Sequence, residues 1–388
     1  MKVCVLTQHP LDDIRVFRRH VRSLLEHGHQ VVFFARPAVG PEPAHPGLTA
    51  RAVRVQGGWR LWRLFKESLV LLRLGLSVAD ADLYHFHNPM LLLTGLILQR
   101  RTGRPVVYDL HEDYPNQVRM KYWIWAPLRE PAARFFELLQ AAAVKRFSAV
   151  VVADHNLGQI FRPHARDLEV VFNFPRLESF PPASPRDQAD RPGQRRLVMV
   201  GGIARERGSS DAVEALAILG ERRPGLTLDI VGHGHDEAYL AELRGLIERR
   251  GLAGRVNLTG LVPHERVIEL LGQADIGLCP LRDVPKFRVN LPQKIFEYMA
   301  CSLPVVGSDL PTIAPFLKGQ GDGQAAGLCH HPGDPASLAQ ALEQLLAEPR
   351  QAAAMGREGR RRVEREYNWE AMEERLLGLY ARLTGTSA

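Results

Sequence analysis

The sequence predicts an α/β protein made of two doubly wound domains that face a cleft between them. Its 388 residues, 45% of them hydrophobic, are enough to fill two domain cores. Short apolar runs alternate with helix-length segments in both halves, which is typical of parallel sheets covered on both faces. A stretch rich in proline and charged residues separates the halves, as expected of an interdomain linker.

Six short apolar runs in the first half are expected to form strands, and they are residues 3–7, 30–35, 83–86, 105–109, 149–153 and 169–172. Segments long enough for helices lie between most of them, for example residues 14–27, 91–101 and 132–146. Ligands of such sheets bind beyond the carboxyl ends of the strands, so the loops that follow the strands are candidate sites. The first of these loops carries Asp12, Asp13 and Arg15, which could face the cleft but are expected to cap the next helix.

The domain boundaries follow from the same pattern. We expect the first domain at residues 1–174, the linker at 175–194 and the second domain at 195–366. Strands of the second domain are expected near residues 197–200, 226–231, 256–258, 276–278, 303–306 and 327–329. The remaining residues, 367–388, contain a final helix at about 370–383.

The composition narrows the possible partners and compartment. A formal charge of +7 is compatible with nucleic acid, anionic lipid or anionic substrates, but no compact basic motif with interleaved aromatic residues indicates nucleic-acid binding. No apolar stretch reaches the roughly 20 residues that span a bilayer, and the first apolar run is too short for a signal peptide. The four cysteines are far apart and lie among apolar residues, which predicts reduced thiols in a cytoplasmic protein.

Residues 59–76 form a basic segment with interleaved aromatic side chains. Such a helix could lie in a membrane interface on the inner face of the membrane, as a peripheral contact with anionic lipid. A helix that packs on the sheet with its arginines in solvent predicts the same pattern. A second aromatic and basic cluster at residues 121–131 favours an acceptor that is carried by a membrane.

The stretch at residues 290–309 combines a turn, a helix and a strand, with charges inside an apolar helix. Pro292 suits the first position of a helix. Lys294 and Glu297 lie three residues apart, on one face of that helix, and buried charges need partners. They could pair with each other. Alternatively, Lys294 and the free N–H groups in the stretch from Asn290 to Gln293, at Asn290, Leu291 and Gln293, could bind a phosphate. Glu297 would then accept hydrogen bonds from sugar hydroxyls.

The first strand of the second domain runs into Gly201 and Gly202, followed by Arg205 and Arg207. Glycines let the backbone approach a diphosphate closely, and arginines supply charged hydrogen bonds to it. An ordinary turn between a strand and a helix would also use glycines. The pattern by itself is therefore compatible with both roles.

In the first domain, His111 and two carboxylates follow the strand at residues 105–109, where side chains are well placed for a cleft. A helix cap or a solvated loop is the alternative. His85 and His87 flank another strand end, but two histidines alone do not make a metal site. No set of three or four ligands has the usual spacing, so we expect no metal requirement.

The run "LPQKIFEYMA…LPVVGSD" resembles the donor-site segment of family 4 retaining glycosyltransferases, whose members have the GT-B fold of two Rossmann-like domains. The resemblance extends over nearly the whole chain. It implies that a hexosyl group moves, with retention, from a UDP- or GDP-sugar to a hydroxyl of a glycan or lipid-linked acceptor in polysaccharide or glycolipid synthesis. The first domain would take the acceptor, the second would bind the donor, and the final helix would cross back onto the first domain.

The resemblance also assigns roles to individual residues. Gly232 lies in the turn "VGHGH" that would face the nucleotide, and backbone groups near Leu261 and Val262 would meet the base. His111 would contact the donor sugar and Glu297 the ribose. Two positions depart from the family pattern: Val289 replaces a common glutamate and Gly202 a common arginine. These departures leave a non-catalytic subunit that binds a sugar nucleotide or glycan as an alternative. A nucleotide-sugar epimerase of the same architecture is a second alternative.

Overall fold

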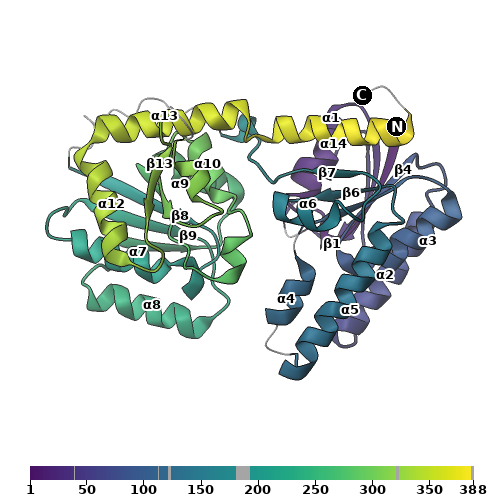
Figure 1. Ribbon diagram of the computed structural model, residues 1–388, viewed down its shortest axis with the longest axis horizontal. Coiled ribbons are helices and arrows are strands. Elements are labelled where there is room, and N and C mark those ends of the chain that lie inside the picture. The colour runs from purple at the N-terminus through teal and green to yellow at the C-terminus, as the bar shows by residue number, and fades with distance from the viewer. Residues whose placement is uncertain (39, 112, 121–123, 181–192, 320–322, 386–388) are drawn as a thin grey trace. The chain divides into compact units, whose positions relative to one another are not determined.

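The computed structural model describes residues 1–38, 40–111, 113–120, 124–180, 193–319 and 323–385, without the side chains of residues 60, 61 and 120. The described chain forms two units (Figure 1). The first unit comprises Met1–Asn173 and Trp369–Ala388, and the second comprises Phe174–Asn368. Each unit has its own parallel sheet.

The sheet of the first unit contains β1 (Lys2–Pro10), β2 (Gln30–Arg36), β3 (Leu48–Ala52), β4 (Leu83–His87), β5 (Val106–Leu110), β6 (Ala149–Val152) and β7 (Leu168–Val170). Their order is β3-β2-β1-β4-β5-β6-β7, and every pair is parallel. Strands β4, β5 and β6 are buried along their whole length, as expected for a sheet covered on both faces. The sequence did not predict β3, because this partly exposed edge strand lacks an apolar run.

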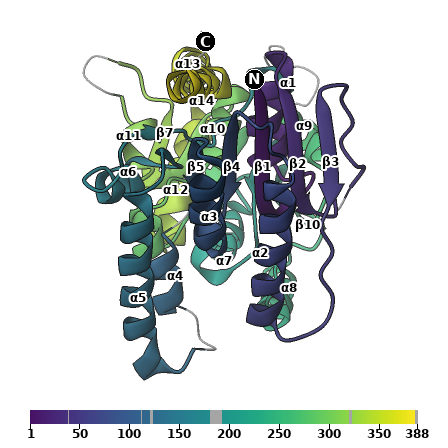
Figure 2. The same cartoon turned by 90° about the vertical axis from the view of Figure 1, so that its right-hand side faces the viewer.

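The helices of the first unit are α1 (Arg22–Glu26), α2 (Arg60–Leu76), α3 (Leu92–Thr102), α4 (Tyr114–Met120), α5 (Ala126–Val144), α6 (His155–Phe161) and α14 (Trp369–Thr384). A π-helical segment, η1 (Val16–Val21), precedes α1, and a short 3₁₀ turn, η2 (Pro89–Leu91), precedes α3. Helix α3 contacts both α2 and α5 (Figure 2). No helix in the described part of the chain is long and apolar enough to cross a bilayer.

The second unit contains β8 (Arg195–Val200), β9 (Leu226–Val231), β10 (Val256–Gly260), β11 (Ile276–Cys279), β12 (Val305–Ser308) and β13 (Gly327–His330), in the parallel order β10-β9-β8-β11-β12-β13. Its helices are α7 (Ser209–Leu219), α8 (Glu237–Arg249), α9 (His264–Gln273), α10 (Lys294–Ala300), α11 (Ala314–Leu317), α12 (Pro335–Ala347) and α13 (Pro349–Arg365). Short 3₁₀ turns are η3 (Leu177–Ser179), η5 (Arg205–Arg207) and η6 (Pro285–Arg288). The predicted class, two α/β units with parallel sheets, is confirmed.

The last helix, α14, packs in the core of the first unit rather than the second. Trp369 is fully buried, and its indole N–H donates to Ser23 Oγ at 2.8 Å. Tyr380 is also fully buried, and its hydroxyl hydrogen-bonds to His85 Nδ1. The end of the chain therefore completes the unit with which the chain begins.

Candidate functional site

Helix α10 is held beneath the carboxyl ends of two central strands of the second sheet. The Tyr298 hydroxyl accepts a hydrogen bond from Val200 N at 2.8 Å and donates to Leu278 O at 3.0 Å. The Tyr298 ring packs against β11 because residue 277 is glycine. A Cβ added there would lie 2.5 Å from Tyr298 Cγ. These contacts fix the helix, and with it Lys294, relative to the turn that follows β8.

Lys294 and Arg207 converge on this turn. A Cβ placed on Gly201 would lie 3.3 Å from Arg207 Nη1 and 3.5 Å from Lys294 Nζ. Within the described residues, Lys294 Nζ is buried and has no hydrogen-bond partner. Burial lowers the pKa of Lys294, and the charge of Arg207 lowers it further. The interpretation that Lys294 simply pairs with Glu297 is therefore wrong, and the ammonium group lies beside Arg207 without a hydrogen-bonded anion among the described residues.

The backbone around Gly201 is shaped by a second close approach. Gly201 has φ of 123° and donates its N–H to Val231 O at 2.9 Å. Gly232 has φ of 152°, and a Cβ there would lie 2.1 Å from Gly201 O. Side chains are excluded at both positions, so the two turns bring bare backbone together at the carboxyl ends of β8 and β9. Gly202, the next residue, is exposed.

The other candidate residues of the second unit have different surroundings. Arg205 forms an ion pair with Glu242 and lies over the ring of Tyr239 at 4.9 Å, so its charge is already matched by a carboxylate. Leu261 is exposed and Val262 half-buried, directly after β10. Asn290 and Leu291 are half-buried just before α10. Glu297 is half-buried one turn after Lys294, and no described residue hydrogen-bonds to its carboxylate.

In the first unit, Asp109 at the end of β5 is the centre of a buried polar cluster. Arg15 donates from Nη2 to Oδ1 at 2.8 Å and from Nε to Oδ2 at 3.2 Å. His20 Nδ1 and His87 Nδ1 each lie 3.3 Å from Oδ2, and His111 Nε2 lies 3.4 Å from Oδ1. Arg15 therefore neither caps a helix nor faces solvent, and the expectation that it would cap is wrong. Asp13 caps instead, accepting from Arg15 N and Val16 N.

His111 is the part of this cluster with access to solvent. Its side chain is 18% exposed, whereas those of Asp109, His20, His85 and His87 are fully buried. Nε2 of His111 lies 3.0 Å from His87 Nδ1, and the ring stacks on His9 with centroids 5.5 Å apart. The inner nitrogen is therefore engaged by the cluster, which fixes the direction of the ring.

Charge in the cluster is concentrated on one ion pair. Burial opposes ionisation of Asp109, but Arg15 and His111 hold its pKa well below the usual value. Burial lowers the pKa of His20 and His85 well below the ordinary range, and that of His87 to about 4. The three buried imidazoles are therefore neutral at pH 7, and Arg15 supplies the balancing charge.

The cluster also bears on metal binding. His20, His85, His87 and Asp109 bring four potential ligand atoms within 4.8 Å of one another, a grouping that sequence spacing did not reveal. Both oxygens of Asp109 are already bound by the Arg15 guanidinium, which would repel a cation at this position. The donor set is therefore a poor fit for a metal ion, and we assign the residues to a buried polar cluster around the Arg15–Asp109 ion pair.

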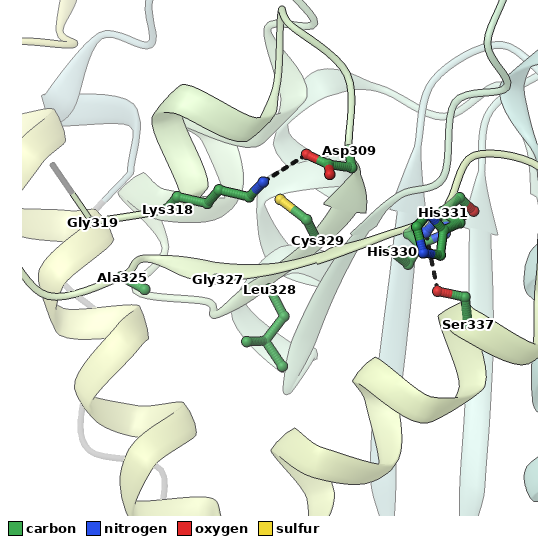
Figure 3. A pocket seen from close by; sticks show the side chains of 10 residues that line it. All are labelled: Asp309, Lys318, Gly319, Ala325, Gly327, Leu328, Cys329, His330, His331 and Ser337. Carbon is green, nitrogen blue, oxygen red and sulfur yellow. Dashed lines mark hydrogen bonds and ion pairs between the residues drawn. The ribbon is translucent and has the colours of Figure 1, made fainter.

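A hollow of about 410 Å³ lies along β13 at the edge of the second sheet (Figure 3). Lys318 and Asp309 pair at 2.8 Å on one side of it, and Cys329 lies beside them. Burial raises the pKa of the Cys329 thiol to about 11, so the thiol is protonated at pH 7. The charges here are already paired, unlike the ammonium group of Lys294.

Comparison with known proteins identifies the architecture. A family model described as glycosyl transferase 4-like domain matches residues 14–176, and one described as glycosyl transferases group 1 matches residues 182–362. The chain belongs to the group 1 glycosyl transferases. Because the two matches cover most of the chain, both units of this glycosyltransferase are accounted for.

Relatives of this glycosyltransferase act in several pathways. A glycogen synthase of Mycobacterium tuberculosis is 24% identical over 93% of this chain and 90% of its own. A D-inositol 3-phosphate glycosyltransferase of Paenarthrobacter aurescens is 25% identical over 86% of this chain and 84% of its own. The relatives have different names, so the comparison shows the family of this chain and not its individual reaction.

Solved structures of glycosyltransferases share the fold. Sucrose-phosphate synthase of Thermosynechococcus elongatus superposes with a TM-score of 0.76 at 20% identity, over 100% of both chains. HepE of Anabaena, solved in complex with UDP-glucose, superposes with a TM-score of 0.70 at 16% identity, over 98% of this chain and 100% of its own. The predicted GT-B fold of this glycosyltransferase is thereby confirmed.

Several residues of the glycosyltransferase escaped the sequence analysis. His20 lies in the helix-length segment 14–27 and Tyr380 in the predicted final helix, and neither stands out in the sequence because their partners lie far away along the chain. Tyr298 was assigned to the apolar face of its helix, although its hydroxyl anchors α10. The sequence signal for this anchor is a tyrosine four residues after the buried Lys294.

Proposed function

We propose that the protein is a retaining glycosyltransferase that moves a hexosyl group from a nucleoside diphosphate sugar to an acceptor hydroxyl. The buried ammonium of Lys294, which faces Gly201 beside Arg207 and has no hydrogen-bond partner among the described residues, carries this proposal. Such a group is costly without an anion and is stabilised by one. HepE, a structural neighbour, was solved with UDP-glucose, which contains the diphosphate that this arrangement would bind.

We assign each part of the donor to a different group of residues. Lys294, Arg207 and the Leu291 N–H group stabilise the diphosphate, whereas the Asn290 N–H already donates to Lys286 O at 3.0 Å. Glu297 accepts hydrogen bonds from the ribose hydroxyls. Backbone groups at Leu261 and Val262 contact the base, which is uracil or guanine. In the first unit, His111 is our candidate for contact with the transferred sugar. Arg205 has a lesser role, because Glu242 already matches its charge.

The proposed chemistry uses no covalent intermediate, because Glu297 is assigned to the ribose, His111 to contact with the transferred sugar and Lys294 to the diphosphate. The bond between the anomeric carbon and the leaving phosphate oxygen breaks, and the acceptor oxygen bonds to that carbon from the same face. The acceptor hydroxyl proton passes to the leaving phosphate. Lys294 and Arg207 stabilise the negative charge that develops on the diphosphate, so no step requires a metal ion.

We expect an α-linked product when the purified protein is incubated with its α-linked donor and a membrane extract. UDP-glucose, UDP-galactose, UDP-N-acetylglucosamine and GDP-mannose are the donors to test, and proton NMR of the product reports the anomeric configuration. A β-linked product would contradict retention. Conversion of the donor in the absence of any acceptor would instead indicate an epimerase, and nucleotide binding without release from any donor would indicate a non-catalytic subunit.

We further propose that the first unit contacts an anionic membrane from the cytoplasmic side. Exposed apolar side chains lie on three successive neighbours, α2, α3 and α5: Trp62, Phe65, Leu69, Leu93, Phe135 and Leu138. The Trp62 and Phe65 rings stack at 5.5 Å, and Lys66 lies over Trp62. Residues 121–123 of the second predicted cluster lie outside the described residues, whereas Trp125 and Leu128 are exposed. Aromatic and basic residues together favour an anionic interface.

Replacing Trp62 and Phe65 together by serine is expected to weaken binding to phosphatidylglycerol vesicles about tenfold or more, since two apolar side chains no longer enter the interface. Vesicle flotation measures the effect. Ile218→Ser is the matched control, because Ile218 is similarly exposed but lies on α7 in the second unit. Equal flotation of the double variant and the wild type would rule out this surface.

A further inference from the structure

A pocket of about 330 Å³ lies in the first unit, away from the Asp109 cluster. It is formed where β2 and β3 end and where α2 passes above them. Arg36 is the last residue of β2, Arg54 follows β3, and Arg63 and Glu67 belong to α2. Because ligands of parallel sheets bind at the carboxyl ends of the strands, this pocket has the position of a ligand site.

The charges around the pocket are unbalanced. Among the described residues that line the pocket, Glu67 is the single carboxylate. It is already neutralised, since Arg36 donates to it from Nε at 2.8 Å and from Nη2 at 2.7 Å. The side chain of Glu67 is only 4% exposed, so the carboxylate of this ion pair is held in place at the base of the pocket. Arg54 and Arg63 are exposed, and neither pairs with a carboxylate in the described part of the chain. Two guanidinium groups therefore face the pocket without a counter-charge.

We propose that this pocket binds an oxyanion, phosphate or carboxylate, carried by the acceptor. Guanidinium groups bind such anions through paired N–H donors, and the pocket volume falls in the range of small-ligand sites. The inference rests on the proposed function, in which the donor diphosphate is bound by Lys294 and Arg207 of the second unit. An anion site in the first unit would therefore serve the other reactant, which is the acceptor.

The position of the pocket suits an extended acceptor. His111 follows β5, and the strand order places β5 three strands away from β2, or about 15 Å along the edge of the sheet. An acceptor whose charged group occupies the pocket would have to reach a hydroxyl at that distance. A phosphorylated or acidic saccharide of two or three sugar units has this length, and a lone monosaccharide does not.

The first test measures anion binding without any donor or transfer. Inorganic pyrophosphate is titrated calorimetrically into the wild type, the Arg54→Gln/Arg63→Gln variant and Lys294→Met. We expect two sites in the wild type, with the pocket site lost only in the arginine variant. Arg51→Gln/Arg100→Gln is the matched control, because both arginines are exposed in the same unit outside the pocket. An unchanged isotherm in the pocket variant would overturn the proposal, whatever Lys294→Met shows.

The second test uses transfer to the acceptor in the membrane extract. The pocket variant should raise the KM for acceptor about tenfold or more, with kcat and the KM for donor unchanged, because each lost charged hydrogen bond weakens only acceptor binding. Phosphatase treatment of the extract should remove the difference if the oxyanion is a phosphate, and leave it if it is a carboxylate. Equal losses in the pocket variant and the Arg51/Arg100 control would show a general effect of charge and refute the site.

Discussion

Replacing Lys294 by methionine is expected to abolish most sugar transfer while raising the melting temperature of the protein. The Lys294 ammonium is buried without a hydrogen-bond partner among the described residues, so it destabilises the unliganded fold. Methionine fills similar space without a charge and should stabilise the second unit by roughly 1–3 kcal/mol. Loss of one charge aimed at the leaving diphosphate should lower kcat on the order of 10²–10³-fold.

The two opposite changes make this experiment decisive. Calorimetry measures the melting temperature, and release of nucleotide from the donor measures the rate. Lys145→Met serves as the control, since Lys145 is exposed at the end of α5 and should change neither quantity. A lower melting temperature with full activity would show that Lys294 is a structural residue and would remove the main support for the donor site.

The Asp109→Asn variant is expected to lose about 3–5 kcal/mol of stability, because it leaves the Arg15 guanidinium buried without its counter-charge. The Arg15 side chain is only 6% exposed, so water cannot replace the carboxylate. Asp211→Asn is the matched control: Asp211 is equally buried and binds Arg282 through Nε at 2.9 Å, but the Arg282 side chain is 41% exposed. Hydration of Arg282 should keep that loss near 1 kcal/mol.

The loss of stability caused by Asp109→Asn should depend on pH. The folded-state pKa of Asp109 lies well below its unfolded value near 4, so its ionised carboxylate stabilises the fold at every pH above about 4. That contribution is lost as the pH falls through the folded-state pKa. The difference in free energy of unfolding between wild type and variant should therefore be constant near neutrality and shrink in acid. Urea denaturation at several pH values measures it, and a difference that persists in strong acid would contradict the assigned ion pair.

Much of the fold could be predicted from the sequence because each strand is a local signal. Apolar runs such as residues 105–109 and 276–278 identify buried parallel strands without knowledge of their neighbours. The segment around Lys294 was also recognisable, because charges inside an apolar helix stand out in a single stretch. Its convergence with Arg207 followed from the rule that ligands bind at the carboxyl ends of parallel strands.

The Asp109 cluster could not be predicted, because its members come from four separate elements. Arg15 precedes the π-helical segment, His85 and His87 lie on β4, and Tyr380 is on the last helix. Each of these residues has an ordinary local explanation, such as a cap or a surface position. Only the sheet order, which places β4 beside β5, brings the histidines to the carboxylate.

The return of α14 to the first unit has a consequence for how the polypeptide is made. During translation, residues 1–173 emerge before the indole of Trp369 and the phenol of Tyr380, which close their interior. The first unit can therefore complete its interior beside Ser23 and His85 only after the α14 segment has left the ribosome. A premature termination codon near position 369 would thus damage the portion of the molecule synthesised earliest.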